Sequence, residues 1–342
     1  MKIGILTASR LNNNGTDLQC AAMHHIFRNI YPSIEIVDYR SPFFEKSRRV
    51  VKRFSLKSFL FVPYFIFLNA SHGLFRKKYI KNSKKKYFDI ESVIKDYDEL
   101  IVGSDQIWNM DITHDLSFYL PGSNLEVKRR SYAVSFGKTD LLPFDEKYHI
   151  RDMLNLFEPV SVRESSATLA LKRIGVDSIE DLDPILMAGK DFLLSLFKPK
   201  KPKKRIVLLY LVENHEGVYD YAKQKAQAIG ARVVRITSPT YHIKGITSKW
   251  FVGLPKWLNY IYYADLVITD SYHCVSTSIA LNKKVYIYDL HNNESNTRTE
   301  CLLNKLEIEK NDYQIDYEIV DKRIDELRRE SFNNIEKWKT EL

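Results

Sequence analysis

Residues 264–273 read ADLVITDSYH, and this stretch decides the fold. Leu266 to Thr269, entered from Ala264, is a short apolar and β-branched run, which is typical of a buried strand in a parallel sheet. Residues 274–281 then continue with helical character. In an open α/β sheet, ligands bind beyond the carboxyl ends of the strands, where the next helix begins. The stretch therefore predicts that Asp270, Ser271 and His273 lie beside a cleft.

These three side chains suit a site that binds an anion and moves a proton. Ser271 can cap the following helix, whose free N–H groups and positive potential attract negative charge. His273 can carry a proton near neutral pH. A structural alternative stays open, in which the stretch is a strand–cap–helix junction and His273 is hydrogen-bonded within it.

Length and composition predict a globular protein of two domains. A chain of 342 residues exceeds one ordinary core, and 44% hydrophobic with 13% aromatic residues is typical of a folded protein. The three cysteines are widely spaced and form no C-x-x-C pair. We therefore expect no disulfide framework and no zinc site, and a cytoplasmic location. The first nine residues read as a strand and lack the pattern of a signal peptide.

The first half repeats a strand–loop–helix pattern. Residues 2–8 and 34–39 predict two strands around a helix that starts near Leu18, and the loop before it contains Gly15. We expect Thr16 or Asp17 to cap that helix, or the helix end to bind a phosphate or carboxylate. The loop has neither the G-x-G-x-x-G nor the Walker A pattern, so no particular nucleotide is indicated. Further strands are predicted at 99–103, 130–136 and 159–162.

The second half restarts the pattern after a Pro/Lys linker at 197–205. Strands are predicted at 206–212, 231–237, 266–269 and 284–288, and a charged terminal helix at 321–342. We therefore predict an α/β fold of two Rossmann-like αβα domains, 1–196 and 205–342, that face a central cleft. This is a GT-B-like architecture, in which we expect the terminal helix to cross back to the first domain.

One segment carries the excess positive charge. Between Lys46 and Tyr87 there are thirteen Lys or Arg and no Asp or Glu, in a chain whose total is +9. Within it, residues 58–71 are uncharged, but they are fewer than the roughly 20 that span a bilayer, and Pro63 interrupts them. The insertion at 46–87 suits contact with an anionic membrane surface. The alternative is an apolar hairpin packed on the domain. Nucleic acid is not favoured, because the aromatics cluster with aliphatics.

Six short motifs coincide with those of one family. In chain order they are N-x-G-x-x-L-Q (13–19), GSDQIWN (103–109), SVRE (161–164), DP (183–184), TDSYH (269–273) and S-x-x-R (295–298). From about residue 3 to about residue 310, the chain resembles the polysaccharide pyruvyl transferase family. The resemblance implies a GT-B-like fold and transfer of a pyruvyl group from phosphoenolpyruvate to a sugar of a surface glycan, forming a cyclic ketal.

The resemblance also implies roles for residues. His273 matches the catalytic histidine of the family and Arg163 its phosphoenolpyruvate-binding arginine. Characterised members tend to have arginine where this chain has Ser271, so Arg298 would replace that cation. We expect Asp105 or Asp270 to share proton transfer with His273. Donor contacts are expected from Arg163, Ser271, Arg298 and Gly15, and acceptor contacts from Asn13, Gln19, Ser104, Gln106, Trp108 and Asn109.

The expected donor explains why cations and helix N-termini are needed. Phosphoenolpyruvate carries a carboxylate and a phosphate, and it is a co-substrate, so we expect neither a cofactor nor a metal. The acceptor is expected to be a lipid-linked or free saccharide at the inner face of the plasma membrane. Two functional alternatives are a nucleotide-sugar-dependent glycosyltransferase of the same architecture and a non-catalytic relative. For four of these residues a structural role is the alternative to a role in the site. Arg163 would form a salt bridge with Glu164, Trp108 would lie in the core, and Asp105 and Asp270 would cap helices.

Overall fold

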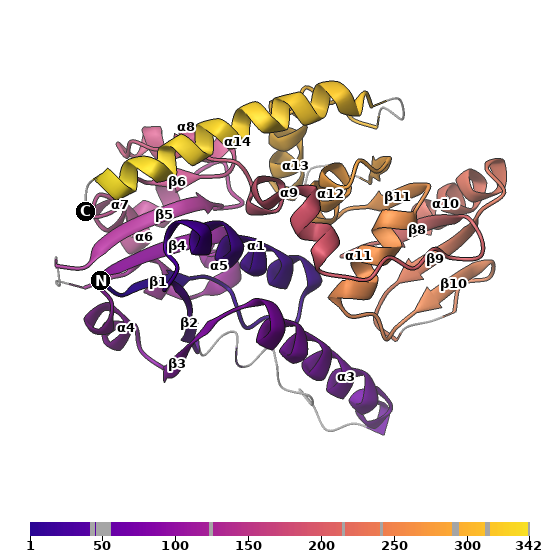
Figure 1. Ribbon diagram of the computed structural model, residues 1–342, viewed down its shortest axis with the longest axis horizontal. Coiled ribbons are helices and arrows are strands. Elements are labelled where there is room, and N and C mark those ends of the chain that lie inside the picture. The colour runs from indigo at the N-terminus through magenta and orange to yellow at the C-terminus, as the bar shows by residue number, and fades with distance from the viewer. Residues whose placement is uncertain are drawn as a thin grey trace.

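The computed structural model describes residues 1–41, 45, 56–122, 126–213, 216–239, 242–288, 294–311 and 315–340. Two parallel sheets, each covered by helices, lie side by side (Figure 1). Of the basic insertion predicted at 46–87, residues 46–55 lie outside the described residues.

The first sheet has seven parallel strands in the order β3-β2-β1-β4-β5-β6-β7. The order reverses between β1 and β4, which is where open α/β sheets bind ligands. The strands are β1 (Ile3–Leu6), β2 (Glu35–Tyr39), β3 (Asn82–Tyr87), β4 (Glu99–Asp105), β5 (Lys128–Val134), β6 (Ser161–Val162) and β7 (Ile179–Glu180). β1 is buried throughout, and β4 and β5 are buried except at one end, as strands covered on both faces must be.

The helices of this half follow the strands on both faces of the sheet. They are α1 (Asn14–Ile30), α3 (Leu56–Tyr79), α4 (Ile90–Asp96), α5 (Met110–Thr113), α6 (Leu142–Tyr148), α7 (Ile150–Leu154), α8 (Ser165–Arg173) and α9 (Pro184–Ser195), with a short 3-10 helix at Leu116–Tyr119.

The N-terminus of α1 differs from the expectation. Asn13 caps this helix, since its side chain accepts hydrogen bonds from the N–H groups of Gly15 and Thr16. Thr16 and Asp17 are therefore free for other contacts. Thr16 reaches Asp105, and Asp17 is buried against His72 and Arg76.

The second sheet has five parallel strands in the order β10-β9-β8-β11-β12. They are β8 (Ile206–Tyr210), β9 (Arg232–Ile236), β10 (Ile246–Lys249), β11 (Leu266–Thr269) and β12 (Val285–Ile287). The helices are α10 (Glu216–Ala228), α11 (Leu254–Tyr263), α12 (Tyr272–Ala280), α13 (Glu294–Lys305) and α14 (Tyr317–Thr340). The stretch 264–273 forms β11 and the start of α12, and β11 is buried between β8 and β12.

One hydrophobic core joins the two halves. α1 and α9 pack against each other, and α12 packs against both, so apolar residues of the two halves form a continuous cluster. α14 leaves the second half and lies across the first (Figure 1). There Trp338 stacks on Phe27 with ring centroids 5.7 Å apart, and Ser331 accepts a hydrogen bond from the Leu182 N–H. The relative position of the two sheets is thereby fixed by packing.

Residues 58–71, expected either at a membrane surface or in a hairpin, belong to the single helix α3, which continues through Pro63. Within the described part of the chain, no helix combines the length and hydropathy that a bilayer crossing requires.

Candidate active site

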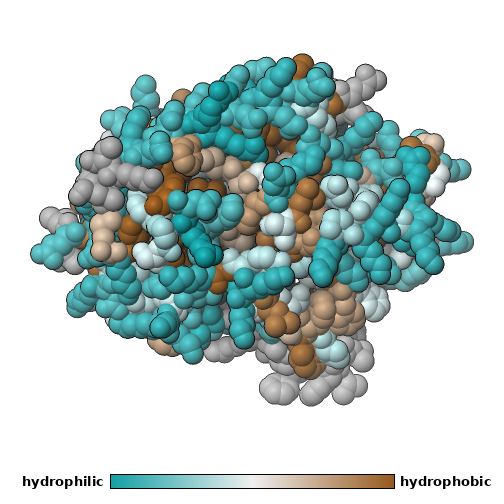
Figure 2. Space-filling view, viewed as in Figure 1, coloured by the Kyte–Doolittle hydropathy of each residue, from teal (hydrophilic) through white to brown (hydrophobic). Residues whose placement is uncertain are grey.

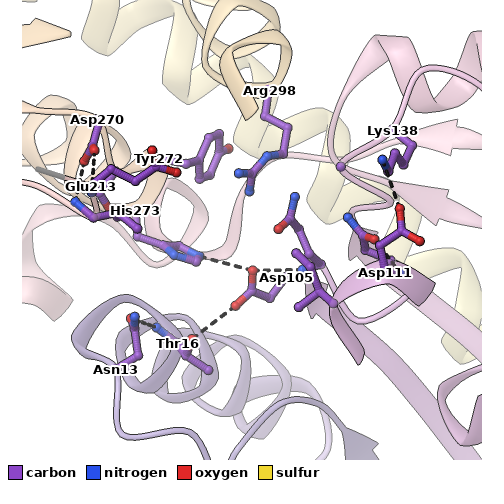
Figure 3. A pocket seen from close by; sticks show the side chains of 16 residues that line it. Asn13, Thr16, Asp105, Asp111, Lys138, Glu213, Asp270, Tyr272, His273 and Arg298 are labelled. Atoms are coloured by element: carbon purple, nitrogen blue, oxygen red, sulfur yellow. Dashed lines mark hydrogen bonds and ion pairs between the residues drawn. The ribbon is translucent and has the colours of Figure 1, made fainter. Parts of the chain in front are cut away.

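A cavity of about 440 Å³ lies where the carboxyl ends of the two sheets face each other. It is bounded by the segments that follow β1, β4 and β5 of the first sheet and β8 and β11 of the second, with α13 completing the wall. The lining residues are Asn13, Thr16, Asp105, Gln106, Asn109, Asp111, Ile112, Gly137, Lys138, Val212, Glu213, Asp270, Ser271, Tyr272, His273 and Arg298. Figure 3 shows their side chains.

His273 and Asp105 meet in this cavity from opposite domains. The Nε2 atom of His273, in the first turn of α12, lies 3.8 Å from Oδ1 of Asp105, at the end of β4. The other carboxylate oxygen accepts a hydrogen bond from the Thr16 hydroxyl at 3.3 Å, and Oδ1 accepts the Gln106 N–H at 2.8 Å (Figure 3). Among the described residues, the Nε2 atom of His273 has no hydrogen-bond partner. The pair is thus held in place while one imidazole nitrogen stays available.

Asp105 also has an uncommon backbone conformation. Its φ is +77°, a left-handed value that costs free energy in residues other than glycine and is tolerated best by Asp and Asn. Such residues concentrate at functional sites, where the surrounding structure holds them.

Gly15 is required for the close approach of the imidazole to α1. A Cβ atom at this position would lie 2.6 Å from both Cβ and Nδ1 of His273, which is closer than real Cβ contacts. Gly15 was expected to contact the donor. It is not among the lining residues, because the imidazole of His273 covers it.

Burial and charge set the protonation of this pair. Burial lowers the pKa of His273, and although Asp105 opposes this shift, the pKa stays below its ordinary value. Burial alone would raise the pKa of Asp105, but His273 and Arg163 outweigh it and the pKa lies below its ordinary value. Near neutral pH the site therefore holds a neutral imidazole beside an ionised carboxylate.

Arg298 supplies a cation to the cavity wall. Its guanidinium lies 5.6 Å from the ring centroid of Tyr272, and its Nε has no hydrogen-bond partner in the part of the chain that the structure describes. Burial and the nearby charge of Arg163 lower the pKa of Arg298, but an arginine remains protonated near neutral pH.

Arg163 lies behind the cavity wall. Its guanidinium packs 4.1 Å from the centroid of the Tyr272 ring, and its Nη1 pairs with Asp183 at 3.0 Å. A second ion pair joins it to Glu164 at 3.5 Å, which was the structural alternative for this residue. Arg163 is not among the lining residues, and the donor contact expected of it stays a prediction.

Asp270 and Ser271 occupy the rim of the second domain. Both carboxylate oxygens of Asp270 accept backbone N–H groups, from Val212 at 2.7 Å and Glu213 at 2.9 Å. Asp270 points toward that loop and away from Asp105 (Figure 3). Ser271 stands at the N-cap of α12, but its side chain forms no capping hydrogen bond, in contrast to the expectation.

The residues expected to contact the acceptor fall into two groups. Asn13, Gln106 and Asn109 line the cavity. The other three lie inside the first domain and do not line it. Ser104 is buried and donates to the Ala133 carbonyl, Gln19 is buried in α1, and Trp108 donates its indole N–H to the Phe118 carbonyl. Trp108 is therefore a core residue, which was the structural alternative to its expected contact with the acceptor.

Sequence reasoning did not select Lys138, Thr16 or Tyr272 for the site. Lys138 pairs with Asp111 at 3.0 Å on the side of the cavity opposite Asp270 (Figure 3). Its position just after the strand expected at 130–136 was a usable signal, because residues after the carboxyl ends of parallel strands reach the ligand.

Of the comparisons with known proteins, one shows the family and another shows the fold. The family model for polysaccharide pyruvyl transferases matches residues 13–292. No curated protein matches the sequence. Similar solved structures include the UDP-GlcNAc 2-epimerase of Neisseria meningitidis bound to UDP-GlcNAc, with TM-score 0.52 and 11% identity over 98% of this chain and 100% of that one.

Two further solved structures are similar to this chain to the same degree. MnaA of S. aureus with UDP has TM-score 0.54 and 11% identity, covering 100% of this chain and 98% of that one. The UDP-N-acetylglucosamine 2-epimerase of Rickettsia bellii has TM-score 0.51 and 8% identity, covering 98% and 96%. At these identities the likeness concerns the fold alone, and it confirms the predicted α/β, two-sheet, GT-B-like architecture.

Proposed function

This chain belongs to the polysaccharide pyruvyl transferase family, and from that premise we propose that it transfers the pyruvyl group of phosphoenolpyruvate to a sugar residue of a surface-polysaccharide precursor. The product is a ketal across two hydroxyls of that sugar. The acceptor is a lipid-linked or free saccharide.

One observation carries the proposal. His273 and Asp105, at the carboxyl ends of strands in two different sheets, lie 3.8 Å apart in the cavity between the domains. A general base and the group that stabilises its charged form are thereby assembled only when both domains are in place.

The proposed reaction balances as follows. The methylene carbon of phosphoenolpyruvate gains one proton, the bond from C2 to the phosphate oxygen breaks, and C2 forms two bonds to sugar oxygens. The two sugar hydroxyls release two protons, of which one enters the new methyl group and one leaves with inorganic phosphate.

His273 is placed to move these protons. Its neutral Nε2 accepts the proton of a sugar hydroxyl, and the resulting imidazolium is stabilised by the ionised carboxylate of Asp105. The imidazolium can then protonate the methylene carbon. Asp105 is the electrostatic partner in this scheme. Asp270 has a different role, because its two oxygens already hold the loop at 212–213.

Two cations of the cavity wall are available to hold the negative charge of the donor. Arg298 and the N-terminus of α12 lie on the His273 side, and Lys138 lies on the other (Figure 3). Arginine suits a carboxylate or phosphate because its N–H groups form two parallel hydrogen bonds. Arg163 would add positive potential from behind Tyr272.

Donor identity is tested by incubating the purified protein with a saccharide acceptor and either phosphoenolpyruvate or a panel of nucleotide sugars. We expect inorganic phosphate release and an acceptor mass increased by one pyruvyl unit. Release of UDP or GDP with sugar transfer would identify a glycosyltransferase instead. If calorimetry detects binding of none of these donors, the chain is a non-catalytic relative.

A further inference from the structure

Helix α3 exposes an apolar stripe where a surface helix ordinarily exposes polar residues. None of its described side chains from 61 to 70 is fully buried. The residues exposed at helical spacing are Pro63, Ile66, Ala70, Gly73 and Leu74. Two exposed aromatic residues of the second domain, Trp250 and Phe251, extend the apolar surface.

The aromatic rings of both domains pack together beside this stripe. The Phe251 ring lies 5.3 Å from that of Phe67 and 6.1 Å from that of Tyr64, measured between centroids. We name the stripe, with Trp250 and Phe251, the α3 face. Figure 2 shows apolar side chains gathered over α3 at the lower edge of the molecule. Large exposed apolar surfaces of this kind mark interaction sites.

Exposed lysines follow the apolar stripe in the sequence. Lys77 and Lys78 end α3, and Lys81, Lys84, Lys85 and Lys86 follow before or within β3, all of them exposed. Residues 56–88 contain no Asp or Glu. Lys85 has a carboxylate partner in Asp96. Lysine also protects an edge strand such as β3, but edge protection does not explain the apolar stripe beside it.

We propose that the α3 face binds an anionic membrane surface. The apolar stripe and the aromatic rings would enter the boundary between headgroups and acyl chains, and the lysines would meet the lipid phosphates. The excess of lysines near the stripe favours anionic lipid over a second copy of this chain, which presents the same excess of positive charge. Membrane binding rests on the proposed function in one respect: the bound enzyme would meet a lipid-linked acceptor.

The buried side of α3 is fixed to the cavity. Arg76 donates hydrogen bonds to the carbonyls of Ser9 and Leu11 and to Asp17, while Asn69 accepts a hydrogen bond from the Asn12 side chain at 2.7 Å. The next residue, Asn13, lines the cavity. A protein bound through the α3 face would therefore hold the cavity at a set distance from the lipid.

The test is co-sedimentation of the full chain with vesicles. We expect binding to vesicles of phosphatidylglycerol and phosphatidylcholine, weaker binding at high salt, and little binding to phosphatidylcholine alone. Combined Lys77→Gln, Lys78→Gln, Lys84→Gln and Lys86→Gln should weaken partitioning by roughly fivefold for each lysine. Ile66→Ser with Leu74→Ser should also release the protein.

Matched control variants distinguish binding through the α3 face from an effect of the total charge or hydropathy of the protein. Lys200, Lys201, Lys203 and Lys204 are exposed in the linker, and changing all four to Gln removes the same charge elsewhere. Ile319 (56% exposed) and Leu169 (62%) match Ile66 (58%) and Leu74 (68%), so Ile319→Ser with Leu169→Ser is the apolar control. Both control proteins should bind like the wild type.

The proposal would be overturned if the wild type did not bind anionic vesicles at low salt, or if the control proteins lost as much binding as the α3-face variants. It would also be overturned if vesicles were not bound and the protein formed a dimer in solution that Ile66→Ser with Leu74→Ser dissociates. Phosphate release with a soluble acceptor should be unchanged by the α3-face substitutions. Failure of the membrane proposal is thus distinguishable from failure of the proposed function.

Discussion

The imidazole of His273 rests directly on the backbone of Gly15, so the proposed base depends on a residue with no side chain. Gly15→Ala would push the ring away from Asp105, because the added Cβ would lie 2.6 Å from the ring Nδ1. We expect kcat to fall by about 10²-fold, the scale of misplaced catalytic groups, with an unchanged circular dichroism spectrum.

Gly73→Ala is the matched control for this change. A Cβ atom at Gly73 would meet no atom of a described residue within 4 Å, so activity with a soluble acceptor should match the wild type. Equal activity of Gly15→Ala and Gly73→Ala would show that the position of His273 does not matter for turnover.

The charge of Asp105 affects the expected pH dependence of the activity. His273 acts as a base only when neutral, so kcat/KM should fall as the pH drops through its pKa, which burial places below the ordinary value of 6.5. Asp105 raises that pKa, so Asp105→Asn should move the acid limb of the profile to lower pH and also reduce kcat. An acid limb that stays in place or moves to higher pH would contradict the pairing. Asp96→Asn, on the surface, is the control.

Single residues show why the site could be predicted only in part. The ends of apolar runs located Asp105 and His273, because parallel strands deliver their following residues to one edge. Ser104 and Trp108 were also expected there. Neighbouring residues at a strand end point in opposite directions, however, and the sequence does not show which of them faces the ligand. Ser104 and Trp108 lie inside, and Asp105 between them faces the cavity.

At the scale of elements, α3 is attached to α1 by a buried ion pair. Arg76 pairs with Asp17 at 3.0 Å, and Asp17 also contacts His72 at 2.7 Å. Asp17→Asn leaves the Arg76 charge uncompensated, so we expect the free energy of unfolding to fall by about 3–5 kcal/mol in chemical denaturation. Lys85→Gln breaks the exposed pair with Asp96 and should change stability by less than about 1 kcal/mol. Equal effects of the two substitutions would refute the structural role of Asp17.

Strands with continuous apolar runs were predictable, and two edge strands were not. β1, β8 and β11 lie within predicted ranges, since burial on both faces requires apolar residues throughout. β3 reads NSKKKY and buries only Ser83 and Tyr87, while β10 reads ITSK. Each pairs on one side only, so its outward residues are free to be polar. These strands form because they pair with a neighbouring strand, and the local sequence does not encode that pairing.

At the scale of the whole molecule, the last helix stabilises the first domain. Trp338 is buried against Phe27, and Arg130 lies 5.3 Å from the centroid of its indole. Trp338→Ala should lower the free energy of unfolding by about 3–5 kcal/mol, as for other buried aromatic residues. Phe332→Ala, a half-exposed position on the same helix, should cost about 1 kcal/mol or less. Equal losses for both would show that α14 is not specifically docked.

The central claim is that the cavity between the two domains transfers a pyruvyl group with His273 as the proton carrier. It is tested most directly by measuring phosphate release and acceptor mass for the wild type and for His273→Ala, with His242→Ala, an exposed position, as the control. We expect one phosphate per pyruvyl group gained, and a rate about 10²–10⁴-fold lower in folded His273→Ala alone. A wild-type rate in His273→Ala, or an acceptor that gains no pyruvyl group from phosphoenolpyruvate, would contradict it.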